Sequence, residues 1–247
     1  MRILSDATAQ KLAEIAEHSE AVRIQWQDRG RAPRGYTKGM AVAFGQLYLD
    51  LLDGDAFASE VANPVIGEVH RDGLAFYADK FEEAGVQIGP FPSDILRSVF
   101  VMQHGLGMRE SSGRYCEGRD ASADNTSAET AEAGLFQCSW NARSASPLLV
   151  TLFEESRGMV NFLEIFREGV TAHAHDEENF GSGDGRDFQA LTKANPLFAV
   201  RFAALCLRKQ RRHWGPINTR QSEIRPEVDA LFRRAMAQIE ADYPVTS

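Results

Sequence analysis

The sequence predicts a mainly α-helical protein. Apolar residues recur at three- and four-residue steps over most of the 247 residues, which is the spacing of one face of a helix. Pro and Gly stand beside several of these stretches, where helices begin and end. One long polar loop interrupts the pattern after Glu110, and it holds almost no large apolar side chain. We therefore expect about eight helices, with a small β-hairpin or an irregular loop inserted after Glu110.

The N-terminal helix is expected to begin at a cap on Ser5, to continue through Leu12 and Trp26, and to end before Gly30. The basic loop that follows, DRGRAPRGYTKG, has the composition of a linker. In the alternative interpretation three of its side chains meet an acidic ligand, namely Arg31, Arg34 and Tyr36. Further helices are expected around residues 37–51, 74–81, 95–110, 147–153, 162–166, 196–207 and 226–242.

Two helix starts carry capping signals. Ser93 or Asp94 is expected to satisfy the first amides of the helix that contains Glu110. Asn195 and Pro196 form an N-cap and first-position pair for the strongly apolar helix that follows them.

Length and composition limit the organisation and the partners. With 43% hydrophobic residues the chain can bury a sizeable core, and we expect a helical layer over residues 1–90 packed on a core of residues 91–247. The net charge of -8 argues against nucleic acid as a partner, because phosphates require a basic surface. Residues 1–20 lack the apolar stretch of a secretory signal, and no run is long enough for a membrane span. We expect synthesis into the cytoplasm, so that any export would follow a signal-independent route.

Glu110 is the first candidate for chemistry. The apolar spacing before it places Glu110 in the last turn of a helix, at the margin between packed scaffold and polar loop. Partial burial at such a margin raises the pKa of a carboxyl group, which can then hold a proton near neutral pH. Glu110 therefore has the expected properties of a general acid.

A second motif follows the loop, where the chain becomes apolar again at residues 134–137, GLFQ. The order ESSG, polar loop and GLFQ resembles the ESS...GLMQ signature of goose-type lysozymes and soluble lytic transglycosylases, over residues 110–137 and the preceding helix. The resemblance implies a lysozyme-like helical fold in which Glu110 is the catalytic acid. It also implies a saccharide cleft lined by the second motif, so we expect these substrate-binding residues: Ser112, Gly134, Leu135, Phe136 and Gln137.

The function implied by this resemblance is cleavage of the β-1,4 bond between the amino sugars of peptidoglycan, by a muramidase or a lytic transglycosylase. Glu110 would protonate the glycosidic oxygen. Two alternatives stay open: a chitosanase-like glycosidase, whose cationic polymer suits an acidic loop, and a non-enzymatic binding or interaction protein on the same scaffold. The longer acidic loop and its flanking cysteines depart from the family pattern.

A hydrolase needs a second catalytic group, and Glu129 and Glu132 are the nearest acids before GLFQ, with Asp120 and Asp124 behind them. A transglycosylase can work with Glu110 alone, because the sugar's own hydroxyl attacks. Trp214 follows the basic segment RKQRRH, and we expect it either to form the turn there or to stack on a sugar face.

We expect neither a cofactor nor a metal ion. His173, His175 and Asp176 are suitable ligand types for zinc, but no third convincing ligand follows at the spacing of a metal site. The glycines at 181, 183 and 185 lack the strand and helix that flank a phosphate-binding loop.

The chain has three cysteines, and an odd number cannot all be paired in disulfides. Cys206 lies in an apolar helical stretch and is expected to be a buried thiol. Cys116 and Cys138 flank the polar loop, and the hypothesis of a bridge between them stands beside that of two separate thiols.

Overall fold

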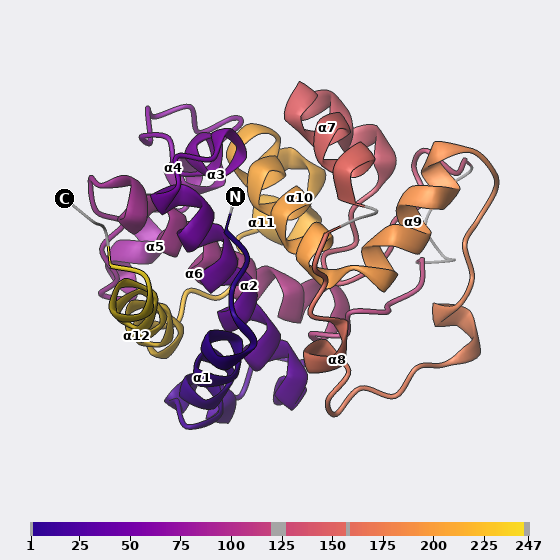
Figure 1. Cartoon of the computed structure of the whole chain (residues 1–247). Helices are drawn as coiled ribbons and strands as arrows, with labels where there is room; N and C mark the ends of the chain where they lie inside the picture. Colours follow the sequence, from indigo (N-terminus) through magenta and orange to yellow (C-terminus); the bar gives the residue numbers. More distant parts are fainter. Residues whose placement is uncertain (1, 120–126, 157–158, 245–247) are drawn as a thin grey trace.

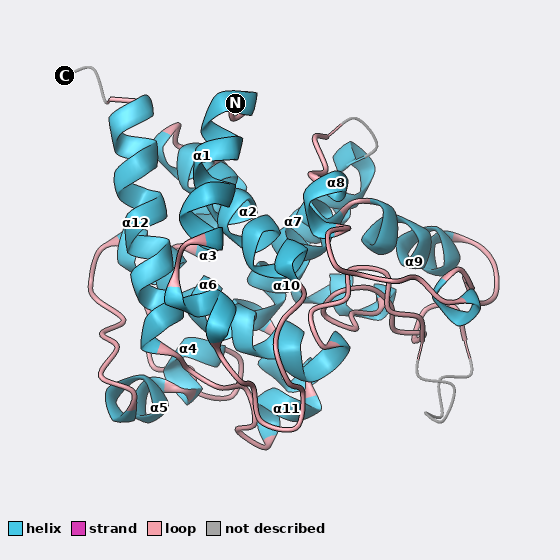
Figure 2. Cartoon of the chain, turned by 90° about the horizontal axis from the view of Figure 1, so that it is seen from below, coloured by secondary structure: helices cyan, strands magenta, loops and turns pink. Residues whose placement is uncertain are grey.

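The computed structural model describes residues 2–119, 127–156 and 159–244, and regular structure in this part of the chain is helical (Figure 1, Figure 2). The mainly α prediction is confirmed. The α-helices are α1 (Asp6–Glu17), α2 (Arg34–Leu52), α3 (Ala56–Val61), α4 (Gly73–Phe76), α5 (Ala78–Glu83), α6 (Pro92–Ser111), α7 (Pro147–Glu155), α8 (Leu163–Phe166), α9 (Asp184–Ala194), α10 (Pro196–Lys209), α11 (Gly215–Asn218) and α12 (Pro226–Asp242).

The two longest helices, α2 and α6, form the centre of the fold and are buried along most of their length. They pack closely at Gly107, where an added Cβ atom would lie 2.4 Å from the hydroxyl oxygen of Tyr36. That hydroxyl donates a hydrogen bond to the carbonyl oxygen of His104 at 2.6 Å. The contact anchors the last turns of α6 and so positions Glu110.

Helices from the two ends of the chain lie together. α1 and α12 pack against each other and against α2 (Figure 1). Apolar side chains from both ends, including Leu4 and Ile239, belong to a single hydrophobic cluster with those of α2 and α6. Residues 1–90 and 91–247 therefore share one core.

The prediction for the N-terminal helix is wrong in its second half. α1 ends at Glu17, and a short 3-10 helix, η1 (Glu20–Arg23), follows it. Trp26 lies beyond both and forms an isolated antiparallel bridge with Gly30. Its indole is 3% exposed and stacks on the ring of His104 at 5.6 Å between centroids. Trp26 is thus buried from a loop, although its spacing from the apolar residues of α1 matches that of one helical face.

The start of α6 also differs from the prediction, because no side chain caps it. Asp94 instead forms an ion pair with Arg97 at 2.5 Å, one turn later. Arg97 is buried and pairs with Asp229 of α12 at 2.7 Å as well. Asp94 therefore helps to neutralise a buried cation.

Two further predictions are corrected. The single helix expected around residues 74–81 is two short helices, α4 and α5. α9 begins at Asp184, between residues 166 and 196, where no helix was expected. Of the two expectations for the segment after Glu110, the described residues agree with an irregular loop, which holds an isolated bridge between Ala133 and Cys138.

The α10 prediction is confirmed, with Asn195 as its cap: the side-chain oxygen of Asn195 accepts a hydrogen bond from the Phe198 amide at 3.0 Å. Nearly every residue of α10 is buried, and the helix follows α9 at an angle of 113°. No single helix in the described segments is long and apolar enough to cross a membrane.

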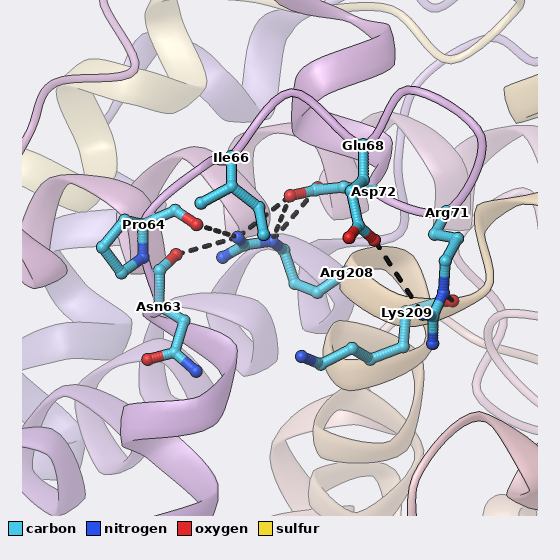
Figure 3. Close-up of a pocket in the computed structure, with 8 residues that line it drawn as sticks. All are labelled: Asn63, Pro64, Ile66, Glu68, Arg71, Asp72, Arg208 and Lys209. Carbon is cyan, nitrogen blue, oxygen red and sulfur yellow. Dashed lines mark hydrogen bonds and ion pairs between the residues drawn. The ribbon is translucent and has the colours of Figure 1, made fainter.

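A buried ion pair ties the end of α10 to the loop before α4 (Figure 3). Nε of Arg208 lies 3.1 Å from both carboxylate oxygens of Asp72. The other guanidinium nitrogens donate to the backbone carbonyls of Val61, Asn63 and Pro64. The charge of Arg208 is thereby satisfied within the fold.

Candidate functional site

Glu110 lies where α6 ends. Ser112 adopts a left-handed conformation with φ of 55°, and its amide bonds the carbonyl oxygen of Met108 at 3.1 Å. Gly113 follows with φ of 75° and bonds the carbonyl oxygen of Gly107. This C-terminal motif stops the helix and turns the chain away. Glu110 is left half-buried in the last turn, where the sequence predicted it.

The surroundings of Glu110 favour its protonated form. The pKa of its carboxyl group is raised to about 8, first by burial and then by the negative charge of Glu132. The positive charges of Arg29 and Arg109 act in the opposite direction and lower this pKa. The C-terminal end of a helix also disfavours a negative charge. Near neutral pH the group therefore carries a transferable proton.

Arg29 and Arg109 were not among the residues predicted from sequence. Nη2 of Arg29 donates to the carbonyl oxygen of Arg109 at 2.5 Å, and Arg109 donates to the carbonyl oxygen of Gln27 at 3.1 Å. These bonds hold the N-terminal loop against the end of α6. The basic character of that loop was visible in the sequence, but its position was not, because the contact joins distant segments.

One of the three side chains that could meet an acidic ligand in the alternative interpretation of this loop is not accessible. Tyr36 is fully buried, and its hydroxyl is bound to His104. Arg34 begins α2.

The structure brings the two sequence motifs together. The hydroxyl oxygen of Ser111, next to Glu110, lies 2.8 Å from the carbonyl oxygen of Leu135. The amide of Gly134 donates to the carbonyl oxygen of Glu117 at 2.8 Å, and Gly134 has φ of 75°. An added Cβ at Gly134 would lie 3.0 Å from the Thr192 side chain. Glycine thus permits the close approach of this segment to α9.

Several expected substrate-binding side chains are instead part of the core. Leu135 and Phe136 are 0% and 1% exposed, so their side chains present no surface to a saccharide. Gln137 is 6% exposed, and its amide nitrogen bonds the carbonyl oxygen of Gly134 at 3.1 Å. Ser112 is half-buried. The side chains of the second motif therefore belong mainly to the packed core beneath Glu110 and not to an exposed surface.

Of the two expectations for Trp214, the structure agrees with the turn: Trp214 lies between the 3-10 helix η5 (Arg211–His213) and α11, and it is 1% exposed. Its indole nitrogen donates to the carbonyl oxygen of Phe136 at 2.8 Å. A buried indole usually requires such an acceptor, and this one fastens the second motif to the turn after α10.

The candidates for a second carboxylate separate clearly. Glu132 is half-buried, and its charge raises the pKa of Glu110. Glu129 forms an ion pair with Arg143 at 2.5 Å and its side chain is 47% exposed. Asp120 and Asp124 lie outside the described residues. Among the candidate acids in the described residues, Glu132 is therefore the one whose charge changes the pKa of Glu110.

The hypothesis of a bridge between Cys116 and Cys138 is wrong, since both thiols are free. Sγ of Cys116 faces Asp176 at 3.9 Å. Cys138 is buried elsewhere, and its pKa is raised by burial and by the charges of Cys206 and Glu110. The expectation that Cys206 is a buried thiol is confirmed.

Two pockets of the described structure lie away from Glu110. One of about 320 Å³ is lined by Asp72, Arg208 and neighbouring residues of the loop before α4 (Figure 3). Another, of about 230 Å³, lies between α3 and α7 beside Arg201. Glu110 lines neither pocket, and its chemistry rests on its burial and on the charges that act on its carboxyl group.

The arrangement around Glu110 can donate a proton and keep a negative charge nearby. Burial holds the proton on Glu110, while Glu132 supplies a second carboxylate. A carboxyl group that holds its proton and a neighbouring carboxylate can act as acid and base in one reaction. Comparisons of the chain with protein-family models, with curated proteins and with solved structures found no match.

Proposed function

We propose that the protein cleaves the β-1,4 glycosidic bonds of peptidoglycan, as a muramidase or a lytic transglycosylase, with Glu110 as general acid. The observation that carries this proposal is the half-buried Glu110 carboxyl, with its pKa raised to about 8, at the junction of the ESSG and GLFQ motifs. A structural glutamate at a helix end has no need of a retained proton. A general acid requires one.

In the proposed reaction Glu110 donates its proton to the glycosidic oxygen while positive charge develops on the neighbouring sugar carbon. The C–O bond breaks, and the leaving sugar departs as an alcohol. Glu110 is then a carboxylate, which Arg29 and Arg109 stabilise because their charges lower its pKa. The same two arginines thus favour the form of Glu110 that exists after proton transfer.

The two enzyme types differ in the role of Glu132. In a hydrolase Glu132 acts as a base on the attacking water. In a lytic transglycosylase the ionised Glu110 takes the proton of the sugar's own attacking hydroxyl, and Glu132 only raises the proton affinity of Glu110. The proximity of Glu132 supports a two-carboxylate reaction without requiring it.

The test is digestion of purified sacculi, followed by mass spectrometry of the soluble muropeptides. Anhydro-sugar ends identify a lytic transglycosylase, and reducing ends identify a hydrolase. Chitosan in a parallel assay tests the alternative polymer.

The variant Glu110→Gln keeps the size of the side chain and removes the transferable proton, so we expect its rate to fall by about 100-fold or more. Glu164→Gln in α8 is the matched control, because the Glu164 side chain is 82% exposed and paired only with Arg167 among the contacts described. Equal rates for the parent and Glu110→Gln would refute the assignment. No release from either polymer by the folded parent would favour a non-enzymatic binding protein.

A further inference from the structure

Three side chains of metal-ligating types lie together beside the segment that follows α6. Glu117, His175 and Asp176 each offer one ligand atom, and these atoms all lie within 4.8 Å of one another. Glu117 comes from the segment after α6, whereas His175 and Asp176 form a 3-10 turn, η4 (Ala174–Asp176), between α8 and α9. Glu117 is the third ligand that the sequence around the histidines did not reveal.

The Asp176 carboxylate is held in place by the backbone. It is 1% exposed, and its Oδ2 accepts a hydrogen bond from the His173 amide at 2.7 Å. Its Oδ1 accepts from the Gly118 amide at 3.3 Å and lies 3.1 Å from Nε2 of His175. Such bonds from surrounding groups are typical of ligands that are oriented before a metal binds.

Arg114 orients both carboxylates from one side. Its Nε lies 2.8 Å from Oε2 of Glu117, and its Nη2 pairs with Oδ2 of Asp176. Oδ1 of Asp176 faces His175 instead. The guanidinium therefore neutralises part of the negative charge without standing between His175 and Asp176.

We propose that Glu117, His175 and Asp176 form a binding site for a divalent transition-metal ion, with zinc as the preferred occupant. One imidazole nitrogen and two carboxylate oxygens suit zinc, whereas calcium and magnesium prefer oxygen ligands alone. The His175 side chain is 60% exposed, which gives an ion a path from solvent. Water would complete the coordination.

Bound zinc would join two segments that are far apart in sequence. The carbonyl of Glu117 accepts the amide of Gly134, so the joined segment is also the support of the GLFQ motif. The metal site stands independently of the function proposed for Glu110, since its evidence and its test involve other residues.

The test is isothermal titration of tag-free, chelator-treated protein with zinc chloride, with metal analysis of the dialysed product. We expect one zinc ion per chain and a higher melting temperature with zinc. His175→Ala and Glu117→Gln should each weaken zinc binding by about tenfold or more, while their circular dichroism stays that of the parent.

Two control variants separate this site from other zinc ligands. His18→Ala removes an exposed histidine at the end of α1 and should leave the affinity unchanged. Cys116→Ser should do the same, because its Sγ faces the other oxygen of Asp176 and lies outside the group of three. The proposal is overturned by the absence of stoichiometric zinc, by undiminished binding in His175→Ala, by loss of binding in Cys116→Ser, or by equal affinity for calcium.

Discussion

The raised pKa of Glu110 makes a prediction about stability that needs no substrate. Glu110 has an ordinary pKa of 4.5 and a pKa of about 8 in the folded protein. Between these values the folded chain holds a proton that the unfolded chain releases. The stability that Glu110 contributes is therefore full below pH 4.5 and is lost as the pH rises through 8.

The magnitude follows from the shift. One pKa unit corresponds to about 1.36 kcal/mol. The rise in the pKa of Glu110 from 4.5 to about 8 therefore means that the folded protein loses roughly 3 kcal/mol of unfolding free energy by pH 7 and roughly 5 kcal/mol above pH 8. Glu110→Gln cannot ionise and avoids this loss. The variant should thus be more stable than the parent at pH 9, by up to about 5 kcal/mol, and nearly equal to it at pH 4.

Urea denaturation of both proteins at pH 4, 7 and 9, followed by circular dichroism, measures this difference directly. Titrating groups common to the two proteins largely cancel in the comparison. A difference in unfolding free energy that stays constant from pH 4 to pH 9 would refute the argument that burial holds a proton on Glu110.

Three other substitutions test the electrostatics of the fold. Glu132→Gln removes a negative charge beside Glu110, so the pKa of Glu110 should fall. This pKa should stay above 4.5, because burial is the larger cause of its rise. The carboxyl carbon signal of Glu110 in an NMR titration measures the pKa. His104 is buried without a hydrogen-bond partner for either ring nitrogen, and its pKa is lowered to about 3. Below pH 6.5 His104 takes up a proton in the unfolded chain but not in the folded one. The parent should therefore lose about 2 kcal/mol of unfolding free energy between pH 6.5 and 5 from this group, whereas His104→Leu should not. Urea curves of the two proteins that show the same pH dependence in this range would contradict the assignment. Asp72→Ala leaves the charge of Arg208 buried without its carboxylate and should cost about 3–5 kcal/mol in thermal or urea unfolding, whereas a cost below about 1 kcal/mol would show that the pair is solvated.

Sequence patterns were sufficient where the deciding interactions are local. The bounds of α12 and the cap of α10 at Asn195 follow from Pro, Asn and apolar spacing, and each signal acts within one or two turns. Glu110 was placed in the last turn of α6 for the same reason, because poor helix formers and a glycine follow it at once.

Burial could not be assigned to individual residues of the second motif from sequence alone. Leu135, Phe136 and Trp214 carry side chains that suit either a cleft or a core, and periodicity does not distinguish the two in a short segment. Only the packed structure shows them inside, with the Trp214 indole bonded to the Phe136 carbonyl.

The electrostatic character of the site was decided by tertiary contacts. The sequence by itself determined a mainly helical chain and a glutamate at a helix end. The structure added Arg29 and Arg109 as charges that act on Glu110, and it showed that of the two candidate acids Glu132 is the one that acts on this carboxyl group. It also added Glu117 as the partner of His175. Charge and coordination depend on distances of a few ångströms between segments that are remote in sequence, and those distances exist only after the helices have packed.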